Sequence, residues 1–262
     1  MIFQNFGFNQ NYPVAAPAPP AAQPILWVDA GNASSYNGSG TTWYDLSTNG
    51  NNLTIAGSPT WDSTTGSFSF PNNTSKYAYN NALSNANVGT GNCSTLVWER
   101  YQGPNDDTYY FPYEWGQMDG SNYDLGGLLA FYADAGLGRG LYERAGGIRL
   151  QYIIPAFGDS VSYNKTTDYN VWRQVVITRD GSNGNVKMYV DGSLYKTITG
   201  LYSGNINQYD KINVGSSNPS NPFGGQLPFY GDIAILQIWD KVLTSTDVSD
   251  NYNTYKTRFG KW

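Results

Sequence analysis

Residues 185–195 carry the pattern that most constrains the fold of this chain. Three apolar side chains alternate with two polar ones over residues 186–190, and the pair Asp191-Gly192 follows. A period of two places alternate side chains on opposite faces of a β-strand. Asp-Gly supplies the two positive-φ positions of a tight hairpin turn. The segment therefore predicts a β-hairpin, and with it an antiparallel sheet.

Further strand-like runs recur along the chain, separated by turns that contain Gly or Asn. They lie at 25–29, 68–70, 94–98, 127–132, 148–154 and 172–179. Residues 231–239 are apolar on both faces, as in a central strand that is covered on each side. Many short strands at this spacing are typical of a β-sandwich.

One helix is expected, close to the end of the chain. Thr244 can cap its start, with Asp247 three positions on in the place of the usual glutamate of a capping box. Val248, Tyr252 and Tyr255 then fall on one helical face. The fold class we predict is all-β: a two-sheet antiparallel jelly-roll sandwich with a short C-terminal helix.

Residues 1–24 differ from the rest in composition. An aromatic and Asn-rich tip is joined to a spacer of Pro and Ala that cannot build a core of its own. We therefore divide the chain into an extended N-terminal arm, 1–24, and one domain, 25–262. The spacer, 13–24, is expected to be polyproline-like and to reach roughly 35 Å at about 3.1 Å per residue. Apolar side chains at the tip would enter pockets on a partner, namely Ile2, Phe3, Phe6, Phe8 and Tyr12. The alternative is that the arm packs on its own domain.

Composition excludes several classes of function. The chain has no histidine, which rules out Ser-His-Asp and Cys-His catalysis and argues against a zinc site. A net charge of -5 without a basic cluster argues against nucleic-acid binding. The single cysteine, Cys93, excludes an intrachain disulfide. Neither a secretory leader nor a membrane-spanning run of about 18 apolar residues is recognisable, so we expect synthesis in the host cytoplasm without membrane insertion.

Three segments of the C-terminal half carry a family resemblance: residues 172–180, 186–192 and 231–252. Together with Trp27-Val28-Asp29-Ala30-Gly31 and Trp43-Tyr44-Asp45-Leu46-Ser47, they resemble laminin-G-like domains of the concanavalin A-like jelly-roll superfamily, of the type found in phage and virus structural proteins. The resemblance covers about 25 to 258 and is weakest from about 100 to 165. It implies two antiparallel sheets of six or seven strands, one of them with a concave face.

The resemblance leaves the function open, because such domains serve as lectins, as adhesion and assembly modules and, in one branch, as endoglucanases. The enzymes carry a Glu-x-Asp-x-x-Glu cluster, since retaining glycosidases need two carboxyls about 5 to 5.5 Å apart. That spacing is absent here. The nearest pair of acids is Glu114 with Asp119, and it departs from the pattern.

Glycan binding is suggested by an aromatic run beside acidic residues. Aromatic rings stack on the apolar faces of sugars, and Asn or Asp side chains bond the hydroxyls. The candidate residues are Asp106, Tyr109, Tyr110, Tyr113 and Trp115. The alternative is that these aromatic residues fill the core or a subunit contact.

A structural calcium ion is a further expectation that rests on the resemblance, because oxygen ligands suit this hard cation. The comparable positions are Asp29, Asp45, Asn49, Asn51 and Asp232. Alternatively, Asp45 and Asn49 stabilise loops and Asp232 accepts a hydrogen bond at a strand end.

Together these observations predict a non-enzymatic surface protein of a virion or another assembly. The arm would attach it to a capsid, a tail or a neighbouring copy in a homo-oligomer, and its outward face would stabilise the shell or contact host glycans. The alternatives are a free-standing lectin and, third, an endoglycosidase.

Overall fold

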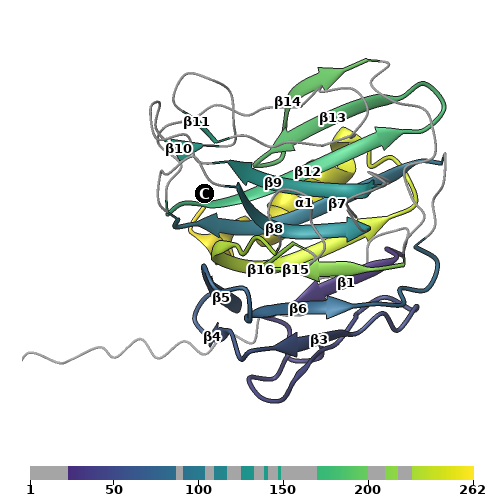
Figure 1. The fold of residues 1–262 in the computed structure, drawn as a ribbon. Coiled ribbons are helices and arrows are strands. Elements are labelled where there is room, and N and C mark those ends of the chain that lie inside the picture. Colours follow the sequence, from purple (N-terminus) through teal and green to yellow (C-terminus); the bar gives the residue numbers. More distant parts are fainter. Residues whose placement is uncertain are drawn as a thin grey trace, which may run out of the picture.

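The computed structural model describes residues 23–86, 91–103, 109–116, 125–132, 139–140, 147–148, 170–199, 210–217 and 226–262. These residues form two antiparallel β-sheets packed face to face, with one α-helix behind the larger sheet (Figure 1). The predicted all-β jelly-roll sandwich is confirmed. The arm tip, Ile2, Phe3, Phe6, Phe8 and Tyr12, lies outside the described residues, as does most of the spacer.

The larger sheet has eight strands in the order β14-β13-β12-β7-β16-β5-β4, and β1 also pairs with β16. Its strands are β1 (Leu26–Asp29), β4 (Thr60–Asp62), β5 (Ser67–Pro71), β7 (Cys93–Tyr101), β12 (Trp172–Asp180), β13 (Asn185–Val190), β14 (Ser193–Ile198) and β16 (Tyr230–Trp239).

Six or seven strands were expected, and β16 explains the difference. It is ten residues long, so its first half pairs with β5 and its second half with β1 along the same edge. Its other edge pairs with β7. All but the first of its residues are buried, which confirms the prediction of a central, doubly covered strand.

The smaller sheet has six strands in the order β2-β3-β6-β15-β8-β9. These are β2 (Thr42–Trp43), β3 (Leu53–Ala56), β6 (Tyr77–Asn80), β15 (Ile212–Val214), β8 (Tyr109–Gly116) and β9 (Leu125–Tyr132). A separate short parallel pair joins β10 (Arg139–Gly140) and β11 (Gly147–Ile148).

The predicted hairpin is present as β13 and β14. Val190 pairs with Ser193, so Asp191 and Gly192 form a two-residue turn, and their φ angles are 48° and 78°. Positive φ at both positions is the requirement that Asp-Gly meets. The other predicted strands are confirmed as parts of β1, β5, β7, β9 and β12, whereas most of 148–154 lies outside the described residues.

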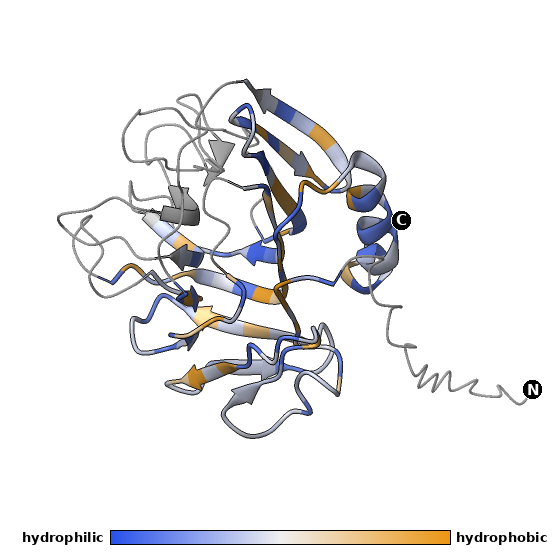
Figure 2. Cartoon of the chain, turned by 90° about the vertical axis from the view of Figure 1, so that its right-hand side faces the viewer, coloured by the Kyte–Doolittle hydropathy of each residue, from blue (hydrophilic) through white to orange (hydrophobic). Residues whose placement is uncertain are grey.

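Two apolar layers hold the sandwich together. The layer between the sheets includes Trp43, Phe68 and Trp115. The second layer covers the opposite face of the larger sheet and includes Trp98 and Phe259. Seen from the side, the order of layers is smaller sheet, larger sheet, helix (Figure 2).

The helix of the second layer is α1 (Ser245–Tyr255), followed by the 3₁₀-helix η1 (Lys256–Phe259). Thr244 caps α1: its side chain accepts from the Asp247 amide, and the Asp247 carboxylate accepts from the Thr244 amide. The predicted capping box is therefore confirmed. Neither helix in the described part of the chain is long and apolar enough to span a bilayer.

Candidate functional site

The outer face of the six-stranded sheet is the candidate functional site. In antiparallel sheets, directly paired residues point to the same face. The register joins one such row across five strands of the sheet, in the order Thr42, Thr54, Tyr79, Asn213 and Glu114. The neighbouring positions along each strand, such as Leu53, Ala78 and Tyr113, belong to the core between the sheets. The row therefore lies on the side away from that core.

Two tyrosines on β6 form the accessible part of this face. Tyr77 and Tyr79 are two positions apart on one strand, their ring centroids are 5.5 Å apart, and the rings are tilted by 40°. Both side chains are partly exposed, whereas Ala78 between them is buried in the core. Opposite them on β3 lie Ala56 and Thr54. The result is a pair of aromatic rings beside a small side chain and an exposed hydroxyl.

The far end of the row is polar but enclosed. Glu114 is fully buried and Asn213 is 6% exposed. The residues on either side of each in its strand are aromatic or aliphatic and belong to the core between the sheets. Because side chains alternate along a strand, Glu114 and Asn213 therefore point outward. Glu114 lies between Asn213 and Leu128 in the register, so the directly opposite positions do not supply a second carboxylate. Asp119, the other member of the predicted acid pair, lies outside the described residues.

The structure corrects the predicted glycan-binding site, because three of its five candidate residues are buried. Tyr110, Tyr113 and Trp115 are at most 2% exposed and belong to the core between the sheets. The Tyr113 hydroxyl donates to Thr95 Oγ1 on the opposite sheet, 2.6 Å away, and burial raises the pKa of this phenol. These rings fill the sandwich and have no free face for a sugar. Asp106 and the side chain of Tyr109 lie outside the described residues.

Three of the expected calcium ligands lie in the loop between β2 and β3, called the opening loop below, and form hydrogen bonds with protein groups. The Asp45 carboxylate accepts hydrogen bonds from the amides of Trp27, Ser47 and Asn51 and from the Ser47 hydroxyl. Asn49 and Asn51 donate through their side-chain amides to the carbonyl of Ile25. The loop thereby fastens the first strand of the domain.

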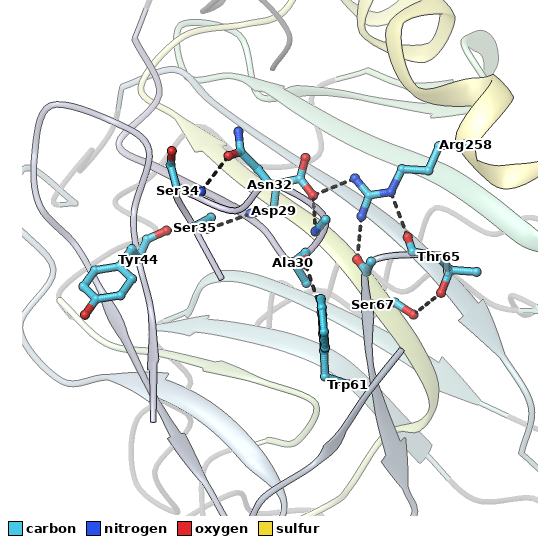
Figure 3. A network of polar contacts seen from close by, with 12 residues as sticks. Asp29, Ala30, Asn32, Ser34, Ser35, Tyr44, Trp61, Thr65, Ser67 and Arg258 are labelled. Atoms are coloured by element: carbon cyan, nitrogen blue, oxygen red, sulfur yellow. Dashed lines mark hydrogen bonds and ion pairs between the residues drawn. The ribbon is translucent and has the colours of Figure 1, made fainter. Parts of the chain in front are cut away.

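The two remaining acids each pair with an arginine on the helix side of the larger sheet. Arg258 Nη1 is 2.6 Å from Asp29 Oδ1, and Arg100 Nη2 is 2.6 Å from Asp232 Oδ2. Figure 3 shows the first pair, in which Arg258 also donates to the carbonyls of Thr65 and Gly66. Within the described ranges no three acidic or other ligating side chains gather into a metal-binding group. Calcium binding stays a prediction, and the structure does not bring Asp29, Asp45 and Asp232 together.

A small polar pocket marks the start of the domain. Its volume is about 370 Å³, and its lining includes Gln23, Pro24, Thr48, Asn49 and Asp240. The Asn49 side chain crosses this region, because its amide donates to the carbonyl of Pro24 and its oxygen accepts from Asn85. The pocket lies where residues 1–22 join the domain.

Tyr77 and Tyr79 were not among the predicted site residues, although the sequence held a usable signal. Tyr77-Ala78-Tyr79 alternates a large polar-tipped ring with a small apolar residue, which is the pattern of a strand with one buried face. The aromatic run at 109–115 was more conspicuous. A β-bulge between Tyr110 and Tyr113 interrupts the alternation there, so inward and outward positions could not be read by counting.

Comparison with known proteins supports the architecture. A family model, Laminin_G_3, described as "Concanavalin A-like lectin/glucanases superfamily", matches residues 72–249. A comparison with curated protein sequences gives no match.

Solved structures with a similar fold include receptor-binding domains of botulinum neurotoxins. The binding domain of serotype G has a TM-score of 0.61 and 17% identity, over 87% of this chain and 50% of that one. The serotype D ligand binding domain, solved in complex with N-acetylneuraminic acid, has a TM-score of 0.57 and 16% identity, over 88% and 50%. The DC binding domain, solved with rat synaptotagmin II, gives 0.58 and 15%, over 89% and 52%. The chain thus spans about half the length of these domains.

Proposed function

Because this chain belongs to the Laminin_G_3 family of the concanavalin A-like lectin/glucanases superfamily, we propose that it is a non-enzymatic carbohydrate-binding domain. The outer face of the six-stranded sheet is the binding surface. The observation that carries this proposal is the pair Tyr77 and Tyr79, two partly exposed rings side by side on a strand whose other face is core.

The chemistry of the face suits sugars. Aromatic rings pack against the C–H faces of pyranoses, and hydroxyl or amide groups beside them bond the sugar hydroxyls. Thr54 lies directly opposite Tyr79 and is exposed. A binding role is also in keeping with the neurotoxin domains of similar fold, one of which was solved with a sugar.

An endoglycosidase is less well supported. Such catalysis needs two carboxyls facing the scissile bond. Glu114 is fully buried, and the residues that pair with it across the sheet are Asn213 and Leu128.

The direct test is a glycan-binding screen of the full chain, repeated with Tyr79→Ala. We expect binding to at least one glycan class and its loss in the variant. Tyr195→Ala is the matched control, because Tyr195 is 42% exposed on β14 of the other sheet. Absence of binding across a broad glycan screen would overturn the proposal.

A role as a virion or assembly surface protein is a second proposal, favoured by the arm. The Pro- and Ala-rich residues 13–24 lead into a firmly held start of the domain, where Ser47, Asn49 and Asn51 all donate to the carbonyl of Ile25. This held start of the domain, together with the polyproline-like spacer that the sequence predicts, would limit the entropy lost when the tip docks on a partner subunit.

The test compares the full chain with a version lacking residues 1–22. We expect the same melting temperature for both and incorporation into native particles for the full chain alone. Mass measurement of the particles with an inventory of their proteins gives the readout. Equal incorporation of the two forms would contradict the attachment role, and a collapse of the shortened form would show that the arm belongs to its own core.

A further inference from the structure

We propose that the outer face selects a linear, uncharged glycan, two consecutive rings of which stack on Tyr77 and Tyr79. This inference rests on the proposed carbohydrate-binding function and adds the class of ligand.

The geometry of the tyrosine pair indicates two adjacent subsites. The rings project from alternate positions of β6, with centroids 5.5 Å apart. This spacing is close to the length of one sugar ring in an extended chain. The rings are tilted by 40° to one another, so a single flat sugar cannot lie on both. Consecutive sugar rings that turn relative to each other can.

The strand beside the pair leaves the rings accessible. Ala56 lies opposite Tyr77 and Thr54 opposite Tyr79 in the β3–β6 register. The methyl group of Ala56 is too short to cover an aromatic face. The exposed Thr54 hydroxyl can donate to and accept from sugar hydroxyls. A chain that runs along β6 would therefore meet two rings, with a hydroxyl beside the ring of Tyr79.

Charge determines which glycans fit. The register places seven described residues of β2, β3, β6, β15 and β8 on this face, and none of them is Lys or Arg: Thr42, Thr54, Ala56, Tyr77, Tyr79, Asn213 and Glu114. A sialic acid carboxylate or a sulfate is normally held by a cationic side chain or by several amide donors. The net charge of -5 also opposes an anionic ligand.

The experiment titrates the full chain by calorimetry with two sets of probes. The first set is cello-, chito- and laminari-oligosaccharides of one to four residues. We expect the affinity for one series to rise about tenfold from the monosaccharide to the disaccharide, because a second ring is stacked. The second set compares lactose with sialyllactose, and we expect the sialylated sugar to bind more weakly.

Tyr77→Ala and Tyr79→Ala should each remove the gain from the second ring, and Tyr195→Ala should leave it unchanged. Melting temperatures show whether each variant is folded. Thr54→Val, which keeps the shape of the side chain and deletes its hydroxyl, gives a milder change on the same face and should weaken binding without abolishing it.

The two titrations distinguish a failure of this inference from a failure of the proposed function. Tyr79-dependent binding that favours sialyllactose, or that is as strong for a monosaccharide as for its oligomers, would overturn this inference and leave the proposed function standing. Absence of binding to neutral and sialylated glycans alike would overturn both. Glycan binding that survives both tyrosine substitutions would place the site elsewhere and contradict the inference.

Discussion

Arg258 and Asp29 form an ion pair between residues 229 positions apart, with Nη1 2.6 Å from Oδ1 (Figure 3). The Asp29 side chain is 2% exposed and that of Arg258 is 17% exposed. The other nitrogens of the guanidinium donate to the carbonyls of Thr65 and Gly66, in the turn between β4 and β5. One side chain of η1 thus ties the C-terminal helical segment to β1 and to the turn between β4 and β5.

Arg258→Ala should lower the free energy of unfolding by about 3–5 kcal/mol, because it removes the cation that pairs with the buried carboxylate and the donors to two carbonyls. Urea denaturation at neutral pH measures the loss. Asp29→Asn is the partner variant, and the double variant should cost less than the sum of the two single changes. Additive costs would show that the two groups do not interact appreciably.

Gly31→Ala should also destabilise the domain, through the same arginine. A Cβ atom at position 31 would collide with the Arg258 guanidinium. We expect the cost to fall when Gly31→Ala is made in an Arg258→Ala background, because the colliding group is gone. The measurement is the same urea titration. An equal cost in both backgrounds would place the strain elsewhere.

The features that could be predicted from the sequence are those determined by nearby residues. The turn at Asp191-Gly192 and the capping box of Thr244 and Asp247 depend on residues at most three positions apart. The partners of Asp29 and Asp232 lie 229 and 132 positions away. No local pattern identifies them, so the sequence could not show that these candidate calcium ligands pair with arginines.

The face on which an aromatic residue lies is the other property that the sequence left undetermined. Tyr113 and Trp115 point between the sheets, and Tyr77 and Tyr79 point outward. On each strand, these residues alternate with residues that point to the opposite face, so the sequence alone gives two sets without showing which one is buried. Only the pairing of β8 with β15 and of β15 with β6 shows which alternate set faces the larger sheet. These two pairings join segments that are about 100 and about 130 residues apart in the sequence.

The capping box predicts a stability that depends on pH. Burial acts to raise the pKa of Asp247, but hydrogen bonds from the backbone and side chain of Thr244, with the charge of Lys241, lower it overall. A carboxyl whose pKa is lower in the folded than in the unfolded protein stabilises the fold at a pH above its usual pKa of 3.8. This stabilisation is lost as the pH falls through the lower pKa of the folded state. Asp247→Asn should therefore destabilise the protein more at pH 7 than at pH 3.

Thr244→Ala tests the other half of the box. It should cost about 1 kcal/mol at pH 7, since the Asp247 amide loses its acceptor. Urea unfolding of both variants across the pH range gives the comparison. A cost of Asp247→Asn that is constant from pH 7 to pH 3 would contradict a role for the ionised carboxylate.

Asp45 offers a test of the opening loop that bears on calcium as well. Its carboxylate accepts four hydrogen bonds, from the amides of Trp27, Ser47 and Asn51 and from the Ser47 hydroxyl. Asp45→Ala deprives these donors of their acceptor and should cost about 1–3 kcal/mol. Thermal unfolding is measured in protein first loaded with calcium and then in the presence of a chelator. If the carboxylate acts through these hydrogen bonds alone, the cost of Asp45→Ala is the same in both conditions. A cost that appears only with calcium would show that Asp45 holds an ion, because a ligand that binds only the native state stabilises it by mass action.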